Sequence, residues 1–122
     1  MKYDMLEKKM ILIIDDDKGV RELFRAFLRL HGFNAYSVNN GISALNLLKK
    51  EYFDIIITDY AMPGMNGIEL TKIIRSLCPR ALIIGISGAN CDGKDFLTAG
   101  ADVFLSKPLQ LQELLSLCQS KI

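Results

Sequence analysis

Five polar side chains could act together chemically, because each one follows a short, mostly apolar run of the chain. Runs of this kind are typical of strands that are buried on both faces of a parallel sheet. The carboxyl ends of parallel strands meet at one edge of the sheet, which is where open α/β sheets bind their ligands. The side chains expected at that edge are those of Asp15, Asp16, Asp59, Ser87 and Lys107.

The chemistry of this set indicates a site for a phosphoryl group. Carboxylates that lie close together cannot all ionise cheaply, and a divalent cation removes their repulsion. Oxygen ligands select a hard ion such as Mg²⁺, which keeps several waters and often takes a phosphate oxygen as a further ligand. Lys107 is a point charge suited to a phosphoryl oxygen, and the Ser87 hydroxyl can donate to another. The set therefore predicts that Asp59 is a nucleophile in phosphoryl transfer.

The elements that must hold these side chains alternate along the chain. Segments with helical periodicity follow segments with strand character, and the latter span 10–14, 34–38, 54–59, 81–86 and 102–106. This alternation predicts an α/β domain with a doubly wound, five-stranded parallel sheet and helices on both faces. The flavodoxin-like strand order 2-1-3-4-5 is expected for five strands, and it places the ends of the first and fourth strands beside Asp59.

Apolar residues at helical spacing predict which side chains face the core. Those of the first helix, which ends at Gly32, are Val20, Leu23, Phe24, Phe27, Leu28 and His31. Those of the third helix are Leu70, Ile73, Ile74 and Leu77, and those of the last are Leu111, Leu114, Leu115 and Cys118. A helix from Asp92 to Gly100 is expected to be the least stable element, because it has about two turns and few apolar anchors: Phe96, Leu97 and Ala99.

Four motifs occur in order at the predicted strand ends. They read I-L-I-I-D-D-D (11–17), D-Y-A-M-P-G-M-N-G (59–67), I-S-G-A (86–89) and S-K-P (106–108). Together they resemble the receiver domain of bacterial two-component response regulators, the family that includes the chemotaxis regulators. The resemblance covers residues 10–122 and leaves residues 1–9 as a charged leader.

The resemblance implies an acceptor and a metal site. Asp59 would be the phospho-acceptor. Mg²⁺ would be bound by Asp59, by Asp16 directly and by Asp15 through water. The backbone carbonyl of Ala61 would be a further ligand.

The resemblance also implies how the phosphoryl group is held and sensed. Lys107, followed by a cis peptide bond, would hold the group, and Ser87 would contact it. Ser87 and Phe104 would then form the switch that carries the change to the surface. The chain departs from the common family pattern in having Phe104 instead of Tyr, no polar side chain at Ala61 to orient water, and Leu109 where Phe is frequent.

Partners follow from the resemblance in the same way. A sensor histidine kinase or a phosphotransfer protein would donate to Asp59, and the domain would catalyse only its own phosphorylation and dephosphorylation. It would therefore be a signalling switch and not a turnover enzyme. A downstream protein would bind the 92–100 helix, the fifth strand and the last helix, with phosphorylation-dependent dimerisation as a further outcome.

Other interpretations stay open at this point. The acids at 15–17 could be an ordinary helix start, with Asp17 as its cap, and Phe104 could be plain core. The arginines of the first helix could form a solvated stripe or dock a kinase; they are Arg21, Arg25 and Arg29. A pseudo-receiver that never takes phosphate and a flavin-binding electron carrier of similar architecture are the rivals from other functional classes.

Composition narrows the functional classes. The 122 residues are 50% hydrophobic with a formal net charge of +1, which favours neither nucleic acid nor an anionic membrane as a partner. Residues 1–9 lack the apolar core of a signal peptide, so a cytoplasmic location is expected. The three cysteines fit no metal-ligand spacing and are expected to be reduced and partly buried. Both a stand-alone regulator and a domain of a longer protein fit the sequence.

Overall fold

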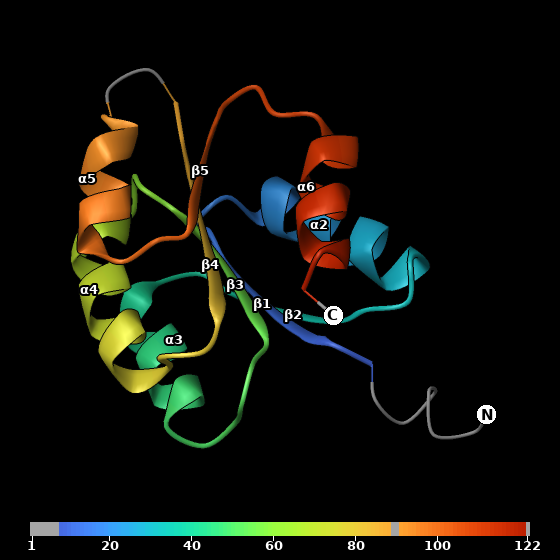
Figure 1. Cartoon of the computed structure of the whole chain (residues 1–122), viewed down its shortest axis with the longest axis horizontal. Coiled ribbons are helices and arrows are strands. Elements are labelled where there is room, and N and C mark those ends of the chain that lie inside the picture. The colour runs from blue at the N-terminus through green and yellow to red at the C-terminus, as the bar shows by residue number, and fades with distance from the viewer. Residues whose placement is uncertain (1–7, 89–90, 122) are drawn as a thin grey trace.

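Five parallel strands form one sheet in the order β2-β1-β3-β4-β5, as expected (Figure 1). The protein is described by a computed structural model that covers residues 8–88 and 91–121. The strands are β1 (Met10–Ile14), β2 (Asn34–Val38), β3 (Ile55–Asp59), β4 (Leu82–Ser87) and β5 (Val103–Ser106). Their bounds match the predicted strands to within one residue. Of the predicted leader, only Lys8 and Lys9 are among the described residues.

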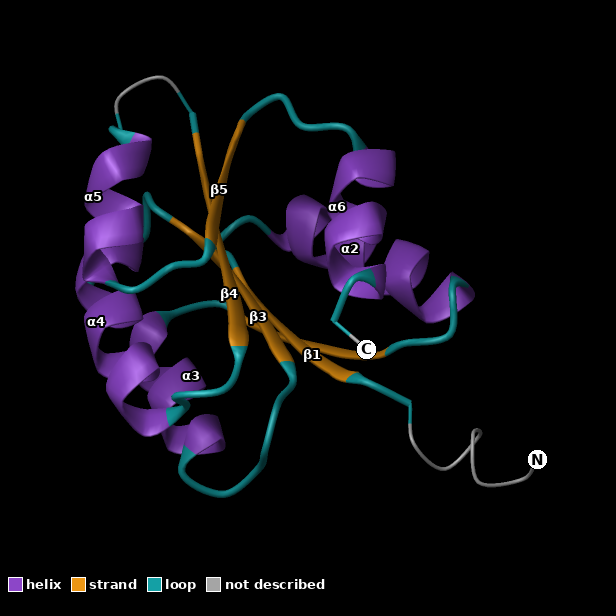
Figure 2. Ribbon diagram, viewed as in Figure 1, coloured by secondary structure: helices purple, strands orange, loops and turns teal. Residues whose placement is uncertain are grey.

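Helices cover both faces of the sheet, which confirms the doubly wound architecture (Figure 2). On one face lie α2 (Lys18–Leu30) and α6 (Leu111–Gln119). On the other lie α3 (Gly41–Leu48), α4 (Gly67–Leu77) and α5 (Gly93–Ala99). None of the helices in the described ranges is long and apolar enough to cross a membrane.

Alternation along the buried strands divides the core into two clusters. Ile11, Ile13 and Ile57 pack with Phe24 and Leu28 of α2 and with α6. The intervening strand residues belong to the second cluster, under α3, α4 and α5; among them are Leu12, Ile14, Ile56 and Ile83. The sheet is therefore fully covered, and polar strand residues are accommodated at its ends.

The predicted helix faces were too wide. Leu23, Ile73, Leu77 and Leu97 are exposed, although each was expected to face the core. Each of them except Leu77 is next in sequence to a buried residue of the same helix. Successive side chains of a helix point about 100° apart, so the neighbour of a buried residue can face the solvent. His31 is also exposed, but its Nδ1 lies 3.0 Å from the Phe27 carbonyl oxygen, in keeping with a helix-end residue near carbonyls. Only a narrow row of side chains on each of these helices is buried against the sheet.

Two arginines of α2 donate hydrogen bonds to neighbouring backbone carbonyls. Arg21 Nη1 donates to the carbonyl of Asp15 at 2.9 Å. Arg29 Nε donates to the carbonyl of Ala35 at 2.9 Å, and its guanidinium lies 5.9 Å from the centre of the Tyr36 ring. These contacts hold α2 against β1 and β2, while Arg29 stays exposed, as the solvated-stripe interpretation expects.

Acidic side chains hold the amino ends of the strands. Asp54 Oδ2 accepts from the Met10 N–H at 2.8 Å, and Asp102 Oδ2 accepts from the Ile83 N–H at 2.9 Å. Asp102 also pairs with Arg75 at 2.7 Å, and Arg75 Nε donates to the Gly100 carbonyl at 2.9 Å. Hydrogen bonds and an ion pair therefore connect the amino ends of the strands. The candidate site lies at the opposite, carboxyl ends.

Candidate functional site

The carboxyl end of β3 places Asp59 in a buried position. Asp59 is 5% exposed, and β3 lies between β1 and β4 in the sheet. Lys107, which follows β5, brings its Nζ to 3.0 Å from Asp59 Oδ1 and to 3.8 Å from Asp15 Oδ2. The ammonium group therefore neutralises part of the charge of two buried carboxylates.

Three carboxylates cluster at this edge, as the sequence predicted. Asp15 is 3% exposed while Asp16 is exposed, and carboxylate oxygens of Asp15, Asp16 and Asp59 lie within 4.8 Å of one another. A set of hard oxygen donors with an open side fits a divalent ion such as Mg²⁺ that keeps several waters. Ala61 lies in the exposed loop after β3.

Charge and burial perturb two groups of the cluster. Burial raises the pKa of the Asp15 carboxyl from 3.8 to about 6; the Asp17 N–H opposes this effect, and the charge of Asp59 adds to it. Burial acts to lower the pKa of Lys107, but its hydrogen bond to Asp59 and the charges of Asp59 and Asp15 raise that pKa overall. Before any cation binds, Asp15 is therefore costly to ionise and Lys107 is firmly protonated.

Backbone contacts that the sequence did not reveal orient the acids. The Asp17 N–H donates to Asp15 Oδ1 at 2.9 Å. The Asp17 side chain caps α2 by accepting from the Val20 N–H at 3.2 Å, which confirms the cap predicted for Asp17. Gly67 packs so closely on the backbone carbonyl of Asp59 that a Cβ there would overlap it. The sequence signal for Gly67 was only its place after Asn66, the cap of α4.

Ser87 ends β4 and is buried beside the acceptor strand. The Lys107 N–H donates to the Ser87 carbonyl at 2.7 Å, and the Lys107–Pro108 bond is cis, as the resemblance implied. Cys91 is an unexpected neighbour: burial raises the pKa of its thiol, an effect that a hydrogen bond with Ser87 partly opposes. Ala89 of the I-S-G-A motif lies outside the described residues.

Phe104 is half-buried on the face of the sheet that α5 covers. Its ring lies 5.7 Å from that of Phe96, which in turn lies 6.4 Å from the ring of Tyr60 (centroid distances). A Cβ on Gly93 would come within 2.5 Å of the Phe104 ring, so the absence of that atom makes room for the ring. An aromatic row thus connects Tyr60, directly after the acceptor, with β5.

Comparison with known proteins yields consistent matches over this fold. The response regulator receiver domain family matches residues 11–119. The response regulator MprA of Mycobacterium leprae is 33% identical over 108 residues, which make up 87% of this chain and 47% of that protein. The chain therefore spans about half the length of the curated relatives it matches.

Solved structures match as well. The CheY-like receiver domain protein from Methanospirillum hungatei has a TM-score of 0.88 and 28% identity, with 94% of each chain covered. The chemotaxis response regulator CheY4 of Vibrio cholerae has a TM-score of 0.85 and 27% identity, with 94% of this chain and 99% of that chain covered.

Proposed function

The chain belongs to the response regulator receiver domain family, and from that premise we propose that it is a phosphorylation-controlled switch with Asp59 as its phospho-acceptor. A sensor histidine kinase or a phosphotransfer protein donates the phosphoryl group. Mg²⁺ is the cofactor, and a change of protein partner is the output. Membership of this family removes the flavin carrier as an alternative.

A single observation carries the proposal: the buried carboxylate of Asp59 contacts an ammonium group and lies close to two further acids. The 3.0 Å contact with Lys107 occupies Asp59 Oδ1. It leaves Oδ2 as the oxygen that can attack. Asp15 and Asp16 supply oxygen ligands within 4.8 Å, which suits a metal-dependent phosphoryl transfer.

The transfer exchanges one bond to phosphorus for another. A carboxylate oxygen of Asp59 bonds to phosphorus while the bond from phosphorus to the donor imidazole nitrogen breaks, and the imidazole leaves with the electron pair and gains a proton. Mg²⁺ held by Asp15, Asp16, Asp59 and the Ala61 carbonyl would neutralise charge on the transferred oxygens. Lys107 holds one phosphoryl oxygen, and Ser87 donates to another.

The output is proposed to pass through Phe104. When the Ser87 hydroxyl moves toward a phosphoryl oxygen, space opens at the end of β4, and the Phe104 ring changes its rotamer to fill it. The packing of Phe104 against Gly93 and Phe96 supports this route, because the moving ring would change the surface of α5 and β5. A downstream partner or a second copy would then bind the face made by α5, β5 and α6.

The phosphodonor protein is proposed to dock beside Lys107. A mostly apolar cavity of about 410 Å³ lies next to the lysine and is lined by Val20, Phe24, Pro108 and Leu109. Such a groove suits the apolar face of a helix that carries the phosphohistidine. The groove adjoins Lys107, which would hold a phosphoryl oxygen, so the docked donor would lie next to the site of transfer.

Mass spectrometry of the intact protein tests the acceptor. Treatment with acetyl phosphate and Mg²⁺ should add one phosphoryl group, and the addition should be lost in Asp59→Asn or when EDTA replaces Mg²⁺. Asp95→Asn, an exposed acid on α5, is the matched control and should be modified normally. Modification that persists in Asp59→Asn would disprove the assignment, and no modification of the native chain would favour a pseudo-receiver.

A further inference from the structure

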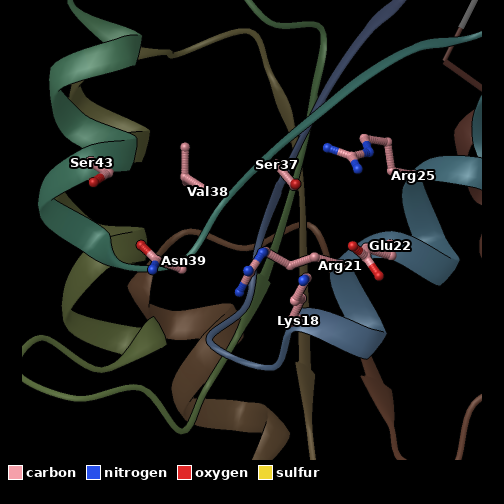
Figure 3. Close-up of a pocket in the computed structure, with 8 residues that line it drawn as sticks. All are labelled: Lys18, Arg21, Glu22, Arg25, Ser37, Val38, Asn39 and Ser43. Atoms are coloured by element: carbon pink, nitrogen blue, oxygen red, sulfur yellow. The ribbon is translucent and has the colours of Figure 1, made fainter.

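A polar cavity of about 330 Å³ lies between α2 and the segment from β2 to α3 (Figure 3). Its walls carry three cationic side chains from one face of α2, namely Lys18, Arg21 and Arg25, and one acid, Glu22. Figure 3 shows the side chains of Arg21 and Arg25 extending from α2 toward β2 and the loop after it. The volume lies at the small end of the range of about 300–1,000 Å³ that is typical of small-molecule sites.

The cations of this cavity have little internal compensation. Within residues 8–88 and 91–121, no carboxylate pairs with Lys18, Arg21 or Arg25 in an ion pair. The contact of Arg21 is with the neutral carbonyl of Asp15, which fixes the guanidinium and leaves other N–H donors for a ligand. Like charges three and four residues apart on a helix repel one another, and a bound anion would relieve that repulsion.

Neutral donors complete the opposite wall. Asn40 Nδ2 donates to Asn39 Oδ1 at 2.8 Å, which leaves the amide nitrogen of Asn39 as a donor. The hydroxyls of Ser37 and Ser43 also line the cavity. The backbone N–H and carbonyl of Ser37 point away from β1, toward the unpaired side of the edge strand β2. This follows because alternate residues of β2 bond to β1, as the Asn34 N–H and the Val38 carbonyl do.

We propose that this cavity binds a small phosphomonoester, such as a sugar phosphate, through Lys18, Arg21 and Arg25. The planar guanidinium groups of Arg21 and Arg25 can each donate two parallel hydrogen bonds to oxygens of a phosphate, and the ammonium group of Lys18 adds a point charge. The hydroxyls and the amide of the other wall suit a ligand whose non-phosphate part is polar and carries hydroxyls better than one with a nucleobase. Among the described residues that line this cavity, Val38 is the only apolar one. This site is separate from Asp59 and does not depend on the proposed phosphorylation.

NMR titration of the full chain tests the site. The isotope-labelled protein is titrated in EDTA at constant ionic strength with glucose 6-phosphate, with inorganic phosphate, and with glucose as the uncharged reference. We expect saturable shifts for glucose 6-phosphate that are confined to amides of 18–25 and 37–43, with a dissociation constant of about 1 mM or lower. Glucose should cause no such shifts, and phosphate should bind more weakly.

Matched charge removals define the binding residues. Arg25→Gln should weaken glucose 6-phosphate at least about tenfold, because it removes a charge-assisted hydrogen bond. Lys49→Gln, an exposed cation on another helix end, is the control and should leave the dissociation constant unchanged. Circular dichroism confirms that both variants are folded.

Three outcomes would overturn the proposal. One is the absence of saturation at 10-fold the expected dissociation constant. Another is an equal loss of affinity for glucose 6-phosphate in Arg25→Gln and Lys49→Gln, which would mean that the protein attracts the anion only through its general positive charge. The last is a set of shifts centred on Asp59 and Lys107, which would assign the anion to the phosphorylation site instead.

Discussion

At the scale of single residues, Asp15 is held in a position that favours its protonated form. It is buried, and only Lys107, at 3.8 Å, offers an ion pair within the described chain. The pKa of Asp15 is about 6 in the folded protein and 3.8 in its ordinary environment. Asp15 therefore does not lower the free energy of unfolding below pH 3.8, where the carboxyl is protonated in both states. Stability is lost as the pH rises through about 6, where the folded protein must carry the ionised group.

We therefore expect Asp15→Asn to stabilise the cation-free protein at pH 8. The free energy of unfolding should rise by about 1–3 kcal/mol, since two units of pKa correspond to nearly 3 kcal/mol at most. The gain should shrink toward zero at pH 4. Urea denaturation in EDTA at both pH values measures it, with Glu51→Gln, an exposed acid, as the control. A gain that does not change with pH would contradict this account of Asp15.

Ser87 provides a second residue-scale prediction. Ser87→Ala should still be phosphorylated by acetyl phosphate, but the Phe104 ring should respond less, because the hydroxyl no longer moves toward the phosphoryl oxygen. The lost charge-assisted hydrogen bond corresponds to roughly 1.5–3 kcal/mol. Aromatic NMR shifts on phosphorylation measure the response. Ser106→Ala changes the exposed register partner of Ser87 and should respond like the native chain. Equal shifts in all three proteins would break the proposed coupling.

The charged residues of the site could be predicted from the sequence, whereas the residues that pack against them and fix their positions could not. Asp15, Asp59 and Lys107 could be found because a polar side chain directly after an apolar run is conspicuous. The close packing of Gly67 on Asp59 depends on a tertiary contact that leaves no periodic signal. The same is true of Cys91 beside Ser87, since three unpaired cysteines looked alike in the sequence.

At the scale of elements, α5 stands out because its seven residues make it the shortest of the described helices. Asp92 caps it by accepting from the Lys94 N–H at 2.9 Å, and Gly100 ends it in the left-handed region with φ 122°, as predicted. Phe96 and Ala99 are its buried residues, whereas Leu97 contributes no anchor. A helix of two turns depends on such packing, because its own hydrogen bonds are too few to stabilise it.

Hydrogen exchange should therefore find α5 less protected than α2. Amides from Asp95 to Ala99 should exchange about tenfold or more faster than those from Phe24 to Leu28. Their protection should change when beryllofluoride and Mg²⁺ imitate the phosphoryl group, because the Phe104 ring packs on Gly93. The α6 amides serve as the internal reference. Protection equal to that of α2, unchanged by the mimic, would make α5 a rigid spacer.

Element order and strand bounds followed from the sequence because strands buried on both faces are continuous apolar runs. The buried faces of the helices were predicted less accurately from the sequence. An exposed leucine such as Leu23 or Leu77 keeps the helical spacing of a core residue, so periodicity alone cannot tell a buried row from its flank. The structural contacts of Arg29 and Arg75 were missed because backbone carbonyls are among their partners, and a carbonyl acceptor leaves no mark on the residue type.

At the scale of the whole molecule, the two edges of the sheet serve different purposes. The amino edge is tied by Asp54, Asp102 and Arg75, while the carboxyl edge carries the acids and the apolar groove next to Lys107. A donor protein would therefore bind along α2 and the segment after β5, without disturbing the contacts at the amino ends of the strands.

Leu109→Ala should separate docking from chemistry. Phosphotransfer from the cognate kinase or phosphotransfer protein should slow by about tenfold, because an apolar anchor of the groove is lost. Phosphorylation by acetyl phosphate should not change, since this small donor does not need the groove. Leu97→Ala removes an exposed leucine from α5 and is the matched control. Equal slowing with both donors would place Leu109 in the chemistry and not in docking.

The contact between Arg29 and β2 also bears on strand pairing between copies of this chain. A strand at the border of a sheet offers unpaired N–H and C=O groups that can template intermolecular β-pairing and aggregation. The Ala35 carbonyl is such a group, and Arg29 already occupies it at 2.9 Å, with its charge laid over Tyr36. β5, at the other border, is only four residues long. An added strand would therefore have to displace Arg29 at one border and could pair with only four residues at the other.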